Sequence, residues 1–190
     1  AAQNNLPYID FQADLPPNNI ASFDNARVRK VRNLCEKHGV EIGIHPSSAI
    51  NNAEYVPIMA EAVDEYLFAN FDLAVRLGCG WLFGHGGYHF GDIQRRQAVS
   101  LERMKRLVDR AEKTDVIIFF ENHNKEPQHA EIHYIPHNVE ETREFFNAIQ
   151  SPHFKWAFNV AHGHLVPEGW QGFLETFGVD NIGQVRLNDN

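Results

Sequence analysis

The sequence contains few cysteines, few basic residues and no long apolar segment, and each shortage argues against a class of protein. Only two cysteines, Cys35 and Cys79, occur among 190 residues, and both have apolar neighbours, which favours buried free thiols over a disulfide framework. The longest purely apolar run, residues 116–120, is far shorter than the roughly 20 residues that a membrane-crossing helix needs. We therefore expect no membrane partner and a cytoplasmic location.

The small number of basic residues argues against nucleic acid as a binding partner. The chain has 17 Lys and Arg against 25 Asp and Glu, a formal net charge of −8. Proteins that bind phosphate backbones usually carry a basic patch and a high pI, whereas the pI here is about 5.7. We expect a small-molecule partner and no nucleic acid. Histidine, with 11 residues, is the one side chain that is unusually abundant.

Apolar and polar residues alternate in a pattern of strands and helices. We predict helices over residues 26–38, 55–77, 97–112, from 138 onward and over 170–177, and strands that end near residues 12, 45, 85, 121, 159 and 188. Strands that alternate with helices at this spacing indicate βαβ units and a parallel sheet. No Gly-x-Gly-x-x-Gly follows any strand, which disfavours a doubly wound nucleotide-binding sheet.

The fold class that fits this pattern is α/β, a parallel (β/α) TIM-type barrel. Such barrels usually need about 250 residues, so we expect an incomplete barrel of about six of the eight units. The whole chain, residues 1–190, is predicted to be a single barrel domain that is truncated at both ends, with one unit missing before Tyr8 and one after Asn190. An unclosed sheet edge makes a homo-oligomer possible.

Polar side chains are concentrated where the predicted strands end. In TIM barrels the active site lies at the C-terminal ends of the strands. The residues at these positions are His45, His85, Glu121 with His123, Asn159 with His162, and Arg186 with Asn188 and Asp189. Glu121 follows an apolar run, where a carboxylate needs a cation or hydrogen-bond donors. Imidazole and carboxylate together suit zinc, manganese, iron or cobalt.

Two other motifs carry less weight. Gly84-His85-Gly86-Gly87 is similar to the oxyanion loop of lipases, but the chain has no Gly-x-Ser-x-Gly elbow. His129, His133 and His137 are spaced by four residues, as on a metal-binding helix. Prolines flank this run, so we interpret it as a loop that follows the Glu121 strand.

The order of these strand-end residues resembles the xylose-isomerase-like barrel superfamily, from Ile9 to Asn190. That superfamily includes sugar and sugar-phosphate isomerases and epimerases as well as the endonuclease IV family. The resemblance implies a divalent-metal enzyme that acts on a sugar or a sugar-like carbonyl compound.

The chain departs from the family pattern at one metal position. The families usually have Asp-x-x-His where this chain has Asn159 and His162, and His-Leu where it has Arg186-Leu187. Both changes affect the same metal position. His45, His85 and Glu121 instead match three ligands of a neighbouring metal position in the endonuclease-like members, so the resemblance implies that these three residues hold the ion.

The predicted function is a metal-dependent isomerase or epimerase of a sugar, sugar phosphate or similar hydroxy-carbonyl compound, with Zn, Mn, Mg or Co as the ion. Glu121 and His162 are the predicted catalytic residues. The predicted substrate-binding residues are His123, Asn159, Arg186, Asn188 and Asp189. Two alternatives remain open: an endonuclease-IV-like phosphodiesterase acting on abasic DNA, and a degenerate barrel that binds sugar without turnover.

Overall fold

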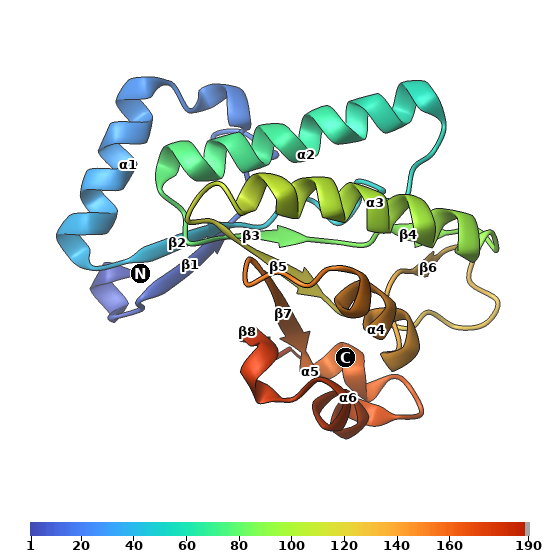
Figure 1. Ribbon diagram of the computed structural model, residues 1–190. Helices are drawn as coiled ribbons and strands as arrows, with labels where there is room; N and C mark the ends of the chain where they lie inside the picture. Colours follow the sequence, from blue (N-terminus) through green and yellow to red (C-terminus); the bar gives the residue numbers. More distant parts are fainter. Residues whose placement is uncertain (189–190) are drawn as a thin grey trace.

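The computed structural model describes residues 1–188, and within them six parallel strands form one curled sheet (Figure 1). The strands are β1 (Tyr8–Phe11), β2 (Glu41–Ile44), β3 (Trp81–Gly84), β5 (Ile117–Glu121), β7 (Phe154–Asn159) and β8 (Ile182–Arg186). Their order in the sheet follows their order in the chain, and every neighbouring pair is parallel. The prediction of an incomplete TIM-type barrel with six strand units is confirmed.

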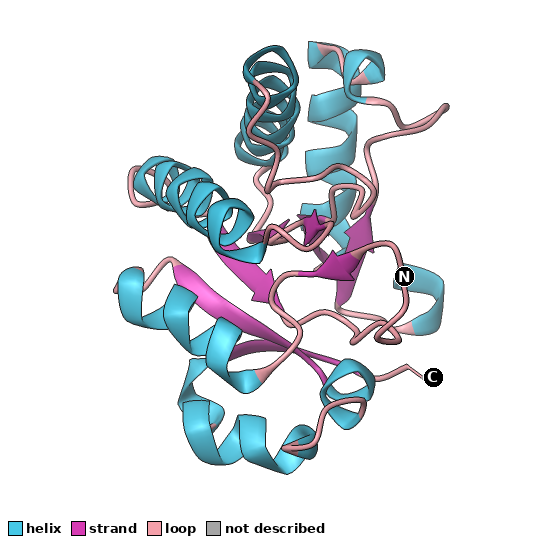
Figure 2. Cartoon of the chain, turned by 90° about the vertical axis from the view of Figure 1, so that its right-hand side faces the viewer, coloured by secondary structure: helices cyan, strands magenta, loops and turns pink. Residues whose placement is uncertain are grey.

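Helices lie around the outside of the curled sheet (Figure 2). They are α1 (Asn25–His38), α2 (Pro57–Leu77), α3 (Ile93–Ala111), α4 (Val139–Ala148), α5 (Val160–His164) and α6 (Gly169–Phe177). Local sequence sets several of their ends. The Asp24 side chain accepts a hydrogen bond from the backbone of Arg27 at the start of α1, and Asn138 caps α4 in the same way. Gly39 and Gly78 end α1 and α2 in the left-handed conformation that favours glycine.

Successive side chains of a strand point to opposite faces of the sheet. One set therefore packs against the helices outside the sheet, and the other set points into the barrel interior. In β5, Ile118 and Phe120 are fully buried in the cluster that packs against the helices. Phe119 points the other way and packs with Trp81 and Phe83 inside the barrel. Glu121 shares the face of Phe119, so it emerges above this apolar floor, at the carboxyl end of the sheet.

Several details differ from the sequence-based expectation. Helix α3 begins at Ile93, four residues earlier than predicted. At this end of the helix Arg96 Nε lies 3.1 Å from Asp92 Oδ2. Helix α5 was not predicted. A short antiparallel pair, β4 (Tyr88–His89) with β6 (His133–Tyr134), joins two loops above the sheet. The segment with histidines spaced by four is a loop, as interpreted from the sequence, and only the two residues of β6 within it were not expected.

Among residues 1–188, no helix combines the length and apolar character needed to cross a membrane. Three short 3-10 helices, Ala2–Asn4, Ile20–Ser22 and Val179–Asn181, complete the described elements. Both cysteines are free thiols, as expected; Cys79 is buried, whereas Cys35 is half-buried.

Candidate active site

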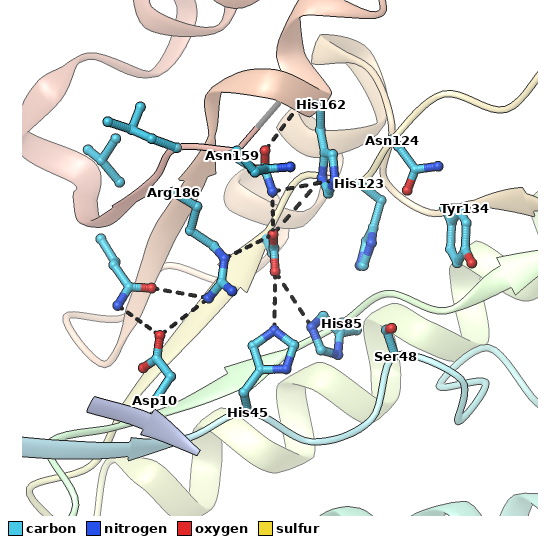
Figure 3. A pocket seen from close by; sticks show the side chains of 15 residues that line it. Asp10, His45, Ser48, His85, His123, Asn124, Tyr134, Asn159, His162 and Arg186 are labelled. Atoms are coloured by element: carbon cyan, nitrogen blue, oxygen red, sulfur yellow. Dashed lines mark hydrogen bonds and ion pairs between the residues drawn. The ribbon is translucent and has the colours of Figure 1, made fainter. Parts of the chain in front are cut away.

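A cavity of about 580 Å³ opens at the carboxyl ends of the strands (Figure 3). This size lies within the range of roughly 300–1,000 Å³ that is typical of small-molecule sites. The cavity is lined by Asp10, His45, Ser48, His85, Glu121, His123, Asn124, Tyr134, Asn159, His162, Gln184, Val185, Arg186, Leu187 and Asn188. The structure therefore brings together every predicted site residue that it describes. Asp189 lies outside the described residues.

His45, His85 and Glu121 form the part of the cavity that could hold a metal ion. Both imidazole Nε2 atoms lie 3.6 Å from Glu121 Oε2, and the three candidate ligand atoms are within 4.8 Å of one another. A tetrahedral ion with bonds of ~2.0–2.1 Å holds its ligands about 3.3 Å apart, so small side-chain shifts would complete the geometry. The Nε2 atom of His85 is buried and has no hydrogen-bond partner among residues 1–188. The donor set thus fits a divalent ion.

The other oxygen of Glu121 contacts a separate group of residues. Oε1 accepts a hydrogen bond from Asn159 Nδ2 at 2.8 Å and lies 3.5 Å from Arg186 Nε. Glu121 is only 4% exposed, and burial by itself would raise its pKa. The contacts with His45 and His85 outweigh this effect and hold the pKa of Glu121 below its ordinary value. The carboxylate is therefore ionised throughout the ordinary pH range.

The protonation pattern of His162 follows from its backbone contact. Its Nδ1 lies 2.8 Å from the carbonyl oxygen of Asn122. Because a carbonyl only accepts, Nδ1 carries the hydrogen of the neutral ring. The Nε2 atom, 3.4 Å from Asn159 Nδ2, is left as an acceptor. Asn159 also caps the short helix α5 through the backbone of His162, which places the ring against the end of β7.

Asp10 on β1 is a site residue that sequence reasoning missed. Trp81 Nε1 donates to its Oδ1 at 2.7 Å, and Gln184 Nε2 and Arg186 Nη1 lie 3.2 and 3.4 Å from its Oδ2. The only available signal was an acidic residue within an otherwise apolar strand. Arg186 therefore lies between two carboxylates of the protein, those of Asp10 and Glu121.

His123 lies in the cavity wall between two other rings. Its ring stacks on the ring of Tyr134, with 5.3 Å between the ring centroids, and its centroid lies 6.2 Å from that of His162. The His123 ring is nearly parallel to both of these rings. Burial and the neighbouring His85 lower the pKa of His123 to about 3, so the ring is neutral. Its Nε2 is buried, and none of the residues that the structure describes forms a hydrogen bond with it.

Comparisons with known proteins support the fold assignment. The family described as "Xylose isomerase-like TIM barrel" matches residues 1–190. No protein of curated function matches the chain in sequence.

Solved structures with the same fold include one epimerase-like protein and two sugar epimerases. A D-tagatose 3-epimerase-like protein has a TM-score of 0.82 at 18% identity, with 100% of this chain and 70% of that chain covered. A D-psicose 3-epimerase crystallised in the presence of D-fructose has a TM-score of 0.78 at 14% identity, with 97% and 63% covered.

The D-allulose 3-epimerase from Methylomonas sp. has a TM-score of 0.74 at 21% identity, with 97% of this chain and 63% of that chain covered. This chain thus spans 70%, 63% and 63% of the lengths of these three structures. At these identities the likeness establishes the fold. The match over all 190 residues shows that the chain belongs to the xylose isomerase-like TIM barrel family.

Proposed function

We propose that this protein is a divalent-metal-dependent isomerase or epimerase of a sugar or similar hydroxy-carbonyl compound. The observation that carries the proposal is the convergence of His45 Nε2, His85 Nε2 and Glu121 Oε2 in a cavity of small-molecule size. Sugar epimerases among the structures with this fold support the same class of substrate. The mixed imidazole and carboxylate donors favour zinc, manganese or cobalt over magnesium, which prefers oxygen ligands.

In the proposed mechanism the roles of Glu121 and His162 are distinct. A divalent ion held by His45, His85 and Glu121 would supply Lewis acidity, which would make the hydrogen on the hydroxyl-bearing carbon beside the substrate carbonyl more acidic. Glu121 would hold this ion, because both of its oxygens already contact protein groups and its low pKa makes it a weak base. His162 would move the proton, because its Nε2 is the acceptor nitrogen of a ring whose Nδ1 is committed to Asn122.

The remaining predicted residues divide into two groups. Asn159 and Arg186 contact Glu121, so we assign them to positioning that carboxylate rather than to direct substrate contact. The unpartnered Nε2 of His123 and the side chain of Asn188 at the cavity rim are available to substrate hydroxyls. The role predicted for Asp189 stays a prediction.

Solvent deuterium exchange tests the proposal directly. The full-length protein is incubated with zinc, manganese or cobalt and candidate ketoses in deuterated water. We expect deuterium at the carbon beside the carbonyl, and none after chelation of the metal. Glu121→Gln should abolish both metal binding and exchange. His162→Gln should reduce exchange by about 10²–10⁴-fold, the usual contribution of one general base, while metal binding is retained.

His164→Gln is the matched control, because His164 lies on the same short helix but is exposed and should leave exchange unchanged. Equal exchange in the His162 and His164 variants would refute the role of His162. Metal-bound protein that exchanges no deuterium with any sugar would refute the isomerase.

The endonuclease-like alternative shares the donor set of two histidines and one glutamate, and a nicking assay on abasic duplex DNA distinguishes it. Nicking that Glu121→Gln abolishes, without deuterium exchange in any sugar, would favour the nuclease. Sugar binding without exchange or nicking would favour the non-catalytic barrel.

A further inference from the structure

The two oxygens of Glu121 face different chemical surroundings. Oε2 faces the Nε2 atoms of His45 and His85, which can act as metal ligands. Among the described residues, Oε1 faces the amide of Asn159 at 2.8 Å, the guanidinium of Arg186 at 3.5 Å and, farther away, Nδ1 of His162 at 4.0 Å. The His162 Nδ1 carries a hydrogen, because it lies 2.8 Å from the carbonyl oxygen of Asn122, so all three groups offer hydrogens to Oε1. In Figure 3 His45 and His85 lie below the central carboxylate, whereas Asn159 and His162 lie above it and Arg186 lies to its left. A carboxylate placed in this way can offer an ion one oxygen and not both.

Arg186 supplies the positive charge on the Oε1 side, and several contacts hold it there. Its Nη1 lies 3.4 Å from Asp10 Oδ2 and 3.4 Å from Gln184 Oε1. Its guanidinium lies over the ring of Phe83, 4.8 Å from the centroid. Asp10 in turn accepts a hydrogen bond at its Oδ1 from Trp81 Nε1, at 2.7 Å. One fixed cation thus serves two carboxylates, one on β1 and one on β5.

The charged side chains that line the cavity limit the number of divalent metal ions that can bind there. Among the described lining residues, Asp10 and Glu121 are the acids and Arg186 is the strong base, so one negative charge is left without a permanent partner. A guanidinium is always protonated and cannot act as a metal ligand. It also repels a cation at the Oε1 side, where the Asn159 amide offers hydrogens rather than a lone pair.

We propose that Arg186 occupies the place of a second cation beside Glu121, so that the site binds a single divalent ion, through Oε2 of Glu121. This inference rests on the proposed function, because it presumes that His45, His85 and Glu121 bind a metal. Arg186 is a positioning residue in this scheme: its charge fixes the orientation of Glu121 and excludes a neighbouring ion. Asn159 contributes by occupying Oε1 with a hydrogen bond.

Metal stoichiometry tests the inference. The protein is dialysed to equilibrium against zinc or cobalt, and the bound metal is measured by elemental analysis. We expect one ion per chain in the wild type. The double variant Asn159→Asp/Arg186→His replaces a donor amide and a cation with two groups that can ligate metal next to Oε1, so it should bind two ions. Asn159→Asp alone should still bind one, because the retained arginine pairs with the new carboxylate.

The possible outcomes separate this inference from the proposed function. Absence of bound metal in the wild type would refute the metal-dependent function and the inference with it. Two ions in the wild type would refute the inference alone. A double variant that unfolds cooperatively like the wild type but binds one ion would also overturn it.

A second measurement on the wild type avoids dependence on the variants. Electron paramagnetic resonance at saturating manganese should show the uncoupled signal of an isolated ion. A signal from two ions that are magnetically coupled through a shared carboxylate would contradict the inference.

Discussion

The histidines of this protein differ in role because of what their ring nitrogens contact. The Nδ1 atom of His153 lies 3.0 Å from a backbone carbonyl oxygen, and that of His162 lies 2.8 Å from another. Because a carbonyl only accepts, each contact fixes the hydrogen of the neutral ring on Nδ1. His153 lies away from the cavity, where this contact joins two loops. In His85 and His123 a buried Nε2 atom lacks any hydrogen-bond partner in the described structure. A buried polar atom without a partner is costly, and in the cavity wall this cost indicates a ligand.

Asp10 provides a prediction at the level of one residue. Trp81, Gln184 and Arg186 all donate to its carboxylate, whereas an amide has only one acceptor oxygen and adds hydrogens of its own. Asp10→Asn should therefore lower the free energy of unfolding by about 1–3 kcal/mol, the usual cost of leaving buried polar groups unpaired. Urea denaturation measures this change. Asp109→Asn, at an exposed position on α3, is the control and should change stability little; equal effects of the two substitutions would contradict the role of Asp10.

Among the elements, β2 and β3 are placed by a close contact between a glycine and a tryptophan. A Cβ atom added to Gly43 in β2 would overlap the indole of Trp81 in β3, including the Nε1 that donates to Asp10. Gly43→Ala should destabilise the fold by about 1–3 kcal/mol, as over-packing of a well-packed interior usually does. The indole must also shift away from Asp10.

Gly80→Ala is the matched control for this prediction, because the nearest atom to its added Cβ is 3.9 Å away. Thermal denaturation and tryptophan fluorescence compare the two variants with the wild type. The interpretation fails if the Gly43 variant is as stable as the Gly80 variant and has an unchanged fluorescence spectrum.

The start of α4 gives a prediction of pH dependence. His137 Nδ1 lies 3.2 Å from Glu141 Oε2. Burial lowers the pKa of His137, but the contact with Glu141 outweighs burial and raises it above the ordinary value. A group whose pKa is raised by folding stabilises the native state below its unfolded pKa of about 6.5. This contribution is lost as the pH rises through the folded pKa.

The corresponding measurement is the free energy of unfolding of the wild type and of His137→Gln at several pH values. The difference between the two proteins should be larger at pH 6 than at pH 9, because only the protonated ring forms an ion pair with Glu141. A difference that does not change with pH would contradict this assignment.

At the scale of the whole molecule, the balance of charge opposes binding to nucleic acid. The net charge is −8, and Arg186, which lines the cavity, is paired with two carboxylates. Several other basic residues lie on outer helices, including Arg103, Arg106 and Arg110 on α3, where they pair with acids of α2. We predict no appreciable affinity for abasic duplex DNA at physiological salt. Tight binding that weakens by ~0.9 log units per log unit of salt for each contacted phosphate would contradict this prediction.

The architecture and the approximate place of the site could be predicted from local patterns. The continuous apolar run of residues 116–120 predicts a strand buried on both faces, and parallel strands bring their carboxyl ends to one rim. This reasoning placed His45, His85, Glu121, Asn159 and Arg186 on the same rim, and all five line the cavity. Their roles in binding metal and substrate stay predictions.

Other features depend on contacts between distant parts of the chain. The β4–β6 pair contains only two residues per strand and joins segments more than 40 residues apart, so no local period indicates it. Helix α5 has five residues and begins at a side-chain cap on Asn159, which is too short for a periodic apolar face.

The order of strands and helices follows from the amino-acid sequence alone, because apolar residues recur with periods of two or 3.6 residues, or in short continuous runs, within single segments. The polar residues that end the strands can be read from the same segments. No local pattern indicates which oxygen of Glu121 faces the histidines and which faces Arg186, nor that Asp10 lies 3.4 Å from the guanidinium of Arg186, 176 residues away. These contacts depend on how far the sheet curls, which is set by the packing of all its side chains at once.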